Sequence, residues 1–174
     1  MSHASIPTDA DLLALASDVA AAALRQRVMV ATAESCTGGW IAKTLTDLAG
    51  SSAWFEAGVV TYSYSAKEAL LGVNPRTLEE KGAVSEAVAV EMVSGALARY
   101  GAGIAVAVTG IAGPTGGTPG KPVGTVWIGW KRRGGYAHAE RFLFDGDREA
   151  VRRQTVAAAL AGMSRELDNW AGAS

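Results

Sequence analysis

The sequence is poor in the residues from which many catalytic centres are built. Its 174 residues include one cysteine and two histidines. A single cysteine excludes an internal disulfide, which fits a reducing cytoplasm. His3 lies in the N-terminal tail, His138 lies in an alternating strand, and no ligand spacing surrounds Cys36, so neither a metal centre nor a Ser-His-Asp triad is expected. We therefore expect a cytoplasmic protein without a cofactor, in which His138 is a surface or groove residue.

The chain also lacks an excess of charge and long apolar runs. Its 16 basic and 17 acidic residues leave a net charge of −1, so it has no bulk electrostatic attraction to nucleic acid or anionic membrane. The one dense basic cluster, residues 131–133, is predicted to be a solvated hairpin tip. No uncharged apolar run approaches the roughly 20 residues of a membrane span, and the N-terminus lacks a signal-peptide pattern. We expect neither nucleic acid nor membrane as a partner.

Neither common nucleotide-binding pattern is present. Gly120-Lys121 lacks the earlier glycine of a P-loop and is followed by Pro122. Gly101-Ala102-Gly103 comes before a predicted strand, whereas a dinucleotide fingerprint follows one. The loop over residues 110–124, with six glycines and three prolines, can still cradle a phosphate through backbone N–H groups and Lys121.

Apolar periodicity predicts one α/β domain. The length and the 49% hydrophobic content suit a single core. We expect a flexible tail over residues 1–8 and a single domain over residues 9–174, folded as an α/β/α sandwich with a mixed, mainly parallel sheet. Strands are predicted at residues 28–33, 54–62, 103–108, 123–130 and 136–144, the last two as a hairpin. Helices are predicted to begin at Thr8 or Asp9, Trp40, Ser65, Ser85 and Asp145 or Asp147, with a single helical turn at 77–81.

Two of the buried strands end in polar, glycine-rich turns, one at Ser35 and the other at Thr109. If these strands are parallel neighbours, both turns open on the edge of the sheet where ligands of open α/β folds bind. Tight connection alone would also explain the glycines. Ser35 is preferred to Cys36 as a nucleophile, because adjacent side chains diverge and the two cannot both face the site.

Without a central histidine, a serine nucleophile needs another base, and Lys67 is the candidate. A base that works near neutral pH needs a lysine pKa about three units below the reference value of about 10.4. We place Lys67 in the first turn of a helix capped by Ser65, where the helix dipole and burial would both lower its pKa. The plainer alternative is an exposed surface lysine. Tyr62 either holds Lys67, relays a proton or belongs to the core.

Long motifs in unbroken order from about residue 10 to 170 resemble the CinA C-terminal domain family. They are TAESCTGG at 32–39, GSSAWFEAGVVTYSYSAKEALLGV at 50–73, GAVSEAVAVEM at 82–92, VAVTGIAGPTGGTPGKPVGTVW at 106–127 and FDGDREAVR at 144–152. The resemblance implies a homodimeric amidohydrolase that converts nicotinamide mononucleotide to nicotinate mononucleotide and ammonia, in salvage of the pyridine nucleotide cycle. It also implies a Ser-Lys type site with four catalytic residues: Ser35, Lys67, Tyr62 and Thr109.

We expect the N–H groups of Thr37, Gly38 and Gly39 to stabilise the oxyanion, and the 110–124 loop to hold the ribose phosphate. A non-catalytic module that binds a pyridine nucleotide, an ADP-ribose-like ligand or a protein partner, as in relatives linked only to competence or DNA damage, is the alternative. An esterase or amidase for other small substrates is a third possibility. The residues expected to contact the substrate are Glu34, Thr37, Gly38, Gly39, Gly110, Gly113, Gly116, Gly117, Lys121 and Arg141.

Overall fold

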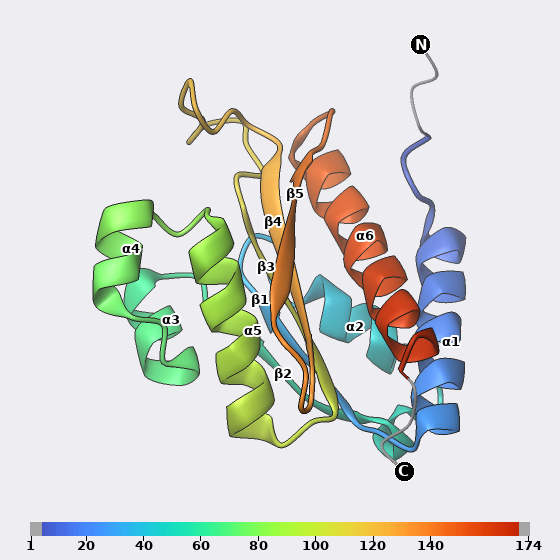
Figure 1. The fold of residues 1–174 in the computed structure, drawn as a ribbon. Helices are drawn as coiled ribbons and strands as arrows, with labels where there is room; N and C mark the ends of the chain where they lie inside the picture. Colours follow the sequence, from blue (N-terminus) through green and yellow to red (C-terminus); the bar gives the residue numbers. More distant parts are fainter. Residues whose placement is uncertain (1–4, 171–174) are drawn as a thin grey trace.

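The computed structural model describes residues 5–170, and part of the predicted tail, residues 1–4, lies outside this range. Helices and strands alternate through most of the chain (Figure 1). In order they are α1 (Asp9–Gln26), β1 (Val30–Glu34), α2 (Trp40–Thr46), the short 3-10 helix η1 (Ser51–Ala53), β2 (Phe55–Val60), α3 (Tyr64–Leu71), α4 (Pro75–Lys81), α5 (Glu86–Tyr100), β3 (Ile104–Gly110), β4 (Thr125–Arg132), β5 (His138–Leu143) and α6 (Arg148–Asp168).

The five strands form one mixed sheet in the order β2-β1-β3-β4-β5. β1 pairs in parallel with both β2 and β3, whereas β4 is antiparallel to β3 and to β5. Four of the five strands therefore run in the same direction, and only β4 runs in the opposite one. β1 lies between β2 and β3, and its five residues are all buried, so the ends of two parallel strands flank the turn that follows Glu34.

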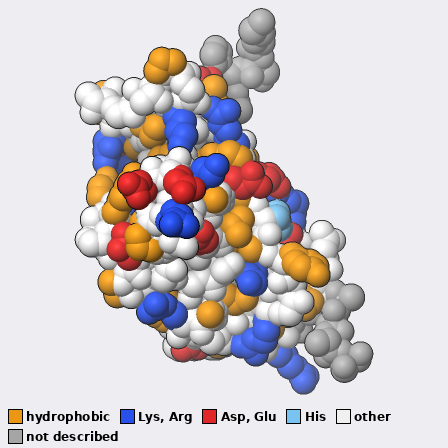
Figure 2. Space-filling view, turned by 60° about the vertical axis from the view of Figure 1, so that its left-hand side comes forward, with side chains coloured by type: hydrophobic (Ala, Val, Ile, Leu, Met, Phe, Trp, Pro, Cys, Tyr) orange, Lys and Arg blue, Asp and Glu red, His pale blue; other side chains and the backbone are white. Residues whose placement is uncertain are grey.

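Helices cover both faces of the sheet, which confirms the predicted α/β/α sandwich. α1, α2 and α6 pack on one face, and α3, α4 and α5 lie on the other (Figure 1). β1 serves both cores, because Val30 belongs to the α6 side while Ala31 and Ala33 belong to the α5 side. On the α5 side, a Cβ at Gly129 would lie 3.0 Å from the carbonyl oxygen of Ala89, so α5 sits close against β4. Figure 2 shows acidic and basic side chains intermixed over the α3–α5 side of the molecule.

The predicted starts of three helices are confirmed, with one of the two candidates as the N-cap of α1 and of α6. Thr8 forms a capping box with Asp11 at the start of α1, and Ser85 and Asp147 cap α5 and α6. α4 is longer than the single turn predicted at 77–81, because Asn74 caps it and Pro75 occupies its first position.

The predicted start of α3 was wrong. Ser63, and not Ser65, is the N-cap: its Oγ accepts a hydrogen bond from the backbone N–H of Ala66 at 3.1 Å. Lys67 is consequently the fourth residue of α3, and its own N–H is already bonded to the carbonyl of Ser63. The positive end of the helix dipole therefore acts on Lys67 less than expected, and any depression of its pKa must come mainly from burial.

Candidate active site

The ends of three parallel strands meet at one edge of the sheet, as the sequence predicted for two of them. Ser35 follows β1, Thr61 follows β2, and Thr109 is near the end of β3. Backbone bonds tie these ends together: Ser35 N–H donates to the carbonyl of Val108 at 3.1 Å, and Thr61 N–H donates to the carbonyl of Glu34 at 2.8 Å. The turn after β1 is thus held on both sides.

Lys67 reaches from α3 into this edge and contacts Ser35. Its Nζ donates to Ser35 Oγ at 2.9 Å and to the carbonyl oxygen of Thr61 at 2.7 Å. Lys67 is only 1% exposed and Ser35 is 9% exposed. The alternative of a surface lysine is therefore excluded, and the pair has the geometry of a nucleophile and its base.

Burial lowers the pKa of Lys67 from its ordinary 10.5 to about 8, against an opposing electrostatic contribution from Cys36. A lysine with a pKa near 8 is about one-quarter neutral at pH 7.5, whereas an unperturbed lysine is about 0.1% neutral. The neutral amine is the form that can accept a proton. Lys67 therefore meets the chemical requirement for a general base.

Cys36 points away from this pair, as expected for adjacent side chains. Its side chain lies in the core between the sheet and α6 and is 5% exposed. Burial raises the pKa of the thiol to about 12. Because the thiolate is the reactive form, Cys36 is unsuited to nucleophilic attack in this position.

Glu34, predicted to contact the substrate, is instead an internal brace of the turn. Its carboxylate is 1% exposed and accepts hydrogen bonds from Thr37 Oγ1 at 2.7 Å and from the backbone N–H groups of Ile41 at 2.8 Å and Ala42 at 3.0 Å. Burial raises the pKa of Glu34, and these donors oppose the rise. The Glu34 side chain thus accepts hydrogen bonds from backbone N–H groups at the start of α2, so these groups need no bound anion.

One of the three expected oxyanion donors is already engaged in the turn. Gly38 N–H donates to the carbonyl oxygen of Ser35 at 3.0 Å, so it closes the turn. Gly38 and Gly39 adopt φ values of 62° and 98°, a left-handed conformation that favours glycine. Within residues 5–170, neither Cys36 N–H nor Thr37 N–H donates to another residue. Cys36 directly follows the nucleophile, where a backbone donor commonly forms part of an oxyanion hole.

Tyr62 lies at the rim of the site and is 60% exposed. Its hydroxyl accepts a hydrogen bond from Arg148 Nη2 at 3.0 Å, and Arg148 Nη1 donates to the carbonyl of Gly113 at 2.9 Å. Arg148 thereby joins the end of β2 to the glycine-rich loop. Sequence reasoning missed this arginine, although it lies in the 144–152 motif that carried part of the family resemblance.

Thr109 is buried and supports the segment between α4 and α5. Its Oγ1 donates to the carbonyl of Ala83 at 2.9 Å, and Ala83 N–H donates to the Tyr64 hydroxyl at 3.3 Å. Tyr64 is the first residue of α3. Thr109 therefore lies beside the site and braces the helix that carries Lys67, and a direct contact with substrate stays a prediction.

Two hydrogen bonds tether the exposed glycine-rich loop to the rest of the protein. Lys121 Nζ donates to the carbonyl of Lys81 at 2.7 Å, and Arg141 Nη2 donates to the carbonyl of Gly120 at 3.4 Å. Its other predicted substrate contacts have structural reasons to be glycine. A Cβ at Gly110 would collide with Val126, and one at Gly117 would collide with Val123. Gly113 and Gly116 have φ values of +82° and +93°, a backbone conformation that favours glycine.

Within the part of the chain that the structure describes, no helix has the length and hydropathy of a membrane span. The same residues contain no cluster of three or more His, Cys, Asp or Glu side chains arranged to bind a metal ion.

Comparison with known proteins agrees with the fold and with the motifs around this site. The chain is 54% identical over 153 residues to the nicotinamide-nucleotide amidohydrolase PncC of Escherichia coli strain K12, covering 88% of this chain and 93% of the relative. It is 58% identical over 139 residues to PncC of Pseudomonas putida, covering 80% and 86%. The crystal structure of the competence/damage inducible protein CihA from Agrobacterium tumefaciens superposes with a TM-score of 0.88 at 44% identity, covering 96% of this chain and 100% of that one. The sequence model of the CinA C-terminal domain family matches residues 12–167, and the chain belongs to this family.

Proposed function

We propose that the protein is a nicotinamide-nucleotide amidohydrolase, which hydrolyses the carboxamide of nicotinamide mononucleotide to nicotinate mononucleotide and ammonia. The observation that carries the proposal is the buried 2.9 Å contact between Lys67 Nζ and Ser35 Oγ, in a chain with relatives named for this activity. A serine alone is a weak nucleophile, and the depressed pKa of Lys67 supplies a base that can accept its proton.

In the first half of the proposed reaction, neutral Lys67 takes the proton from Ser35 Oγ as the oxygen attacks the carboxamide carbon. A carbon–oxygen bond forms, and the carbonyl electron pair moves onto the oxygen. When this intermediate collapses, the carbon–nitrogen bond breaks and Lys67 returns the proton to the leaving nitrogen. Ammonia departs, and the nicotinoyl group stays on Ser35 as an ester.

In the second half, water replaces ammonia. Lys67 accepts a proton from the water as its oxygen attacks the ester carbon, and the bond to Ser35 Oγ then breaks. Ser35 regains its proton, and the acid is released. One base can serve both halves because Lys67 passes on the proton that it accepted and is neutral again at the end of each half.

We assign Cys36 N–H to the developing oxyanion and remove Gly38 N–H from the expected donors, because Gly38 N–H closes the turn. Tyr62 and Arg148 form the outer rim of the site, and Thr109 supports its wall. We assign the ribose phosphate to the glycine-rich loop. Lys121 Nζ can donate to a phosphate oxygen once it releases the carbonyl oxygen of Lys81.

We also propose that the enzyme works in the cytoplasm as a homodimer. Its one cysteine is a buried free thiol, which suits a reducing compartment. β2 is an edge strand of the sheet, and the exposed Val60 and Tyr62 at its end offer apolar surface to a second copy. Light scattering on the purified protein would show a mass of about 36 kDa, twice the 17.9 kDa of one chain, if this is correct.

The deciding experiment is ammonia release from nicotinamide mononucleotide by the purified protein, in the presence of a chelator. Ser35→Ala and Lys67→Met should each lose the activity. Ser17→Ala and Lys43→Met, which alter an exposed serine of α1 and a surface lysine paired with Asp47, should keep it. Release by the wild type that survives either site substitution would refute the Ser-Lys assignment. No release from a folded wild type would favour the binding-module alternative.

A further inference from the structure

Arg152 of α6 holds the backbone of the turn that carries Ser35. Its Nε donates to the carbonyl oxygen of Cys36 and its Nη2 to that of Thr37, each at 3.0 Å. The guanidinium also lies 5.4 Å from the centre of the Trp40 ring. The planar guanidinium of Arg152, whose donors have a fixed arrangement, therefore donates hydrogen bonds to the carbonyl oxygens of the two residues that follow the nucleophile.

These two bonds fix the direction of backbone N–H groups on the other side of the turn. In a planar trans peptide, the carbonyl of one residue and the N–H of the next point in opposite directions. Holding the Thr37 carbonyl toward Arg152 thus directs Gly38 N–H away from Arg152, where it donates to the carbonyl of Ser35 at 3.0 Å.

The same geometry also orients the peptide group between Ser35 and Cys36. The carbonyl of Ser35, held by Gly38 N–H, shares its peptide plane with Cys36 N–H, which must point the opposite way. Cys36 N–H is the proposed oxyanion donor and donates to no other residue among residues 5–170. If the Arg152 bonds were lost, the peptide planes could rotate, and a donor that is aligned for the transition state would lose its alignment.

We propose that Arg152 is a positioning residue that keeps the nucleophile turn in the conformation that binds the oxyanion. The inference rests on the proposed amidohydrolase function. Arg152 acts through the backbone at Cys36 and Thr37. Its loss should therefore lower kcat and leave substrate binding nearly unchanged.

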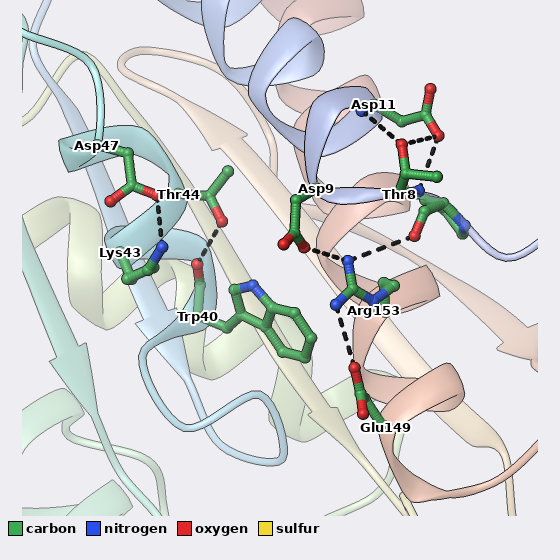
Figure 3. Close-up of polar contacts among 10 residues, drawn as sticks. Thr8, Asp9, Asp11, Trp40, Lys43, Thr44, Asp47, Glu149 and Arg153 are labelled. Atoms are coloured by element: carbon green, nitrogen blue, oxygen red, sulfur yellow. Dashed lines mark hydrogen bonds and ion pairs between the residues drawn. The ribbon is translucent and has the colours of Figure 1, made fainter.

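Arg153 provides a matched control. It lies 4.9 Å from the centre of the same Trp40 ring, but its hydrogen bonds go to Pro7, Asp9 and Glu149 (Figure 3). Both arginines stack on Trp40, and only Arg152 contacts the turn carbonyls. Losing Arg153 should therefore reproduce the loss of surface packing without the effect on the turn.

The test compares Arg152→Met, Arg152→Lys and Arg153→Met. For Arg152→Met we expect kcat to fall by about 10- to 100-fold with KM changed less than about twofold, since direct loss of an oxyanion donor costs about 10²–10³. Arg152→Lys, which can still reach one carbonyl, should recover part of the loss, and Arg153→Met should behave like the wild type. Circular dichroism and thermal melting would identify a variant that fails to fold. If Arg152→Met fails, Arg152→Lys carries the test.

A second readout separates a positioning role from a purely structural one. An analogue with an aldehyde in place of the carboxamide would form a hemiacetal with Ser35, in which the former carbonyl oxygen becomes the oxyanion. Its inhibition constant should rise in the Arg152 variants by the factor by which kcat falls. Binding of nicotinamide mononucleotide to the same variants on a Ser35→Ala background should stay within about twofold of the parent.

The possible failures are distinguishable. A folded wild type that releases no ammonia overturns the proposed function and this inference together. An active wild type with equal kcat in the Arg152 and Arg153 variants overturns the inference alone. A raised KM at unchanged kcat would make Arg152 a substrate-binding residue, which also overturns the positioning role.

Discussion

Lys67 Nζ and Ser35 Oγ lie 2.9 Å apart although 32 residues separate them in the chain. The contact exists because β1 and β2 are parallel neighbours, so that the turn after β1 and the helix after β2 begin at the same edge of the sheet. Lys67 then crosses this edge almost completely buried. The burial that makes the lysine a usable base also removes its ammonium form from water, which costs stability.

The pH dependence of the activity should report the depressed pKa of Lys67. The reaction needs the neutral amine, so kcat/KM should rise about tenfold per pH unit below pH 8 and level off above it. Initial rates of ammonia release between pH 6 and pH 9.5, at substrate concentrations well below KM, would measure this profile. A midpoint near the ordinary lysine value of 10.5, or a flat profile, would argue against Lys67 as the base.

Lys67→Met should stabilise the fold while it abolishes activity. The folded-state pKa of about 8 lies below the 10.5 of the unfolded chain, so at neutral pH the native state bears a charged, buried ammonium at a cost of about 3 kcal/mol. Methionine removes this cost but leaves Thr61 without its donor, and we expect a net gain of roughly 1–2 kcal/mol in the free energy of unfolding at pH 7.

Urea denaturation at two pH values would test this expectation. Between pH 8 and pH 10.5 the unfolded wild type binds a proton that the native state has released, so the stability of the wild type should increase with pH in this window. The advantage of Lys67→Met should shrink correspondingly at pH 10. A variant that is less stable than the wild type at pH 7 would show that the lysine contributes more through its hydrogen bonds than its burial costs.

Glu34→Gln should destabilise the protein and weaken catalysis. The carboxylate offers only acceptors to Thr37, Ile41 and Ala42, whereas an amide would turn an NH₂ group toward at least one of these donors. We expect a loss of about 1–3 kcal/mol in the free energy of unfolding and a lower kcat, because the same turn carries Ser35.

Glu56→Gln is the matched control, since Glu56 is an exposed residue of β2. Chemical denaturation of both variants, with ammonia release measured under native conditions, would separate the two sites. Equal stability of the two variants would contradict the bracing role of Glu34.

The sequence predicted those parts of the site that depend on local pattern and strand direction. Apolar runs that end in polar glycine turns identified Ser35 and Thr109 as neighbours at one sheet edge, and pairing of β1 with β3 confirms this. The role of Glu34 was missed because its partners, seven and eight residues later in α2, depend on how the turn folds back.

Contacts that arise only from tertiary packing were also missed. Ser63 and Ser65 offer equivalent caps in the sequence, and packing of the Tyr64 hydroxyl against Ala83 accompanies the earlier start. Arg148 and Arg152 lie in a motif that the sequence analysis quoted, but their partners are 35 to 116 residues away in the chain. No periodicity reports contacts at such separations.

Thiol reagents should fail to inactivate the native protein. The Cys36 thiol is buried in the core, and its pKa of about 12 leaves roughly a thousandfold less thiolate at pH 8 than a thiol with the ordinary value of 9.0. Iodoacetamide at pH 8 should therefore label the urea-unfolded chain quickly and the folded chain hardly at all, as mass spectrometry would show. Ammonia release should persist in the treated native enzyme. Stoichiometric labelling of folded protein with a parallel loss of activity would instead make Cys36 the nucleophile, because it would require an accessible thiolate that this packing does not allow.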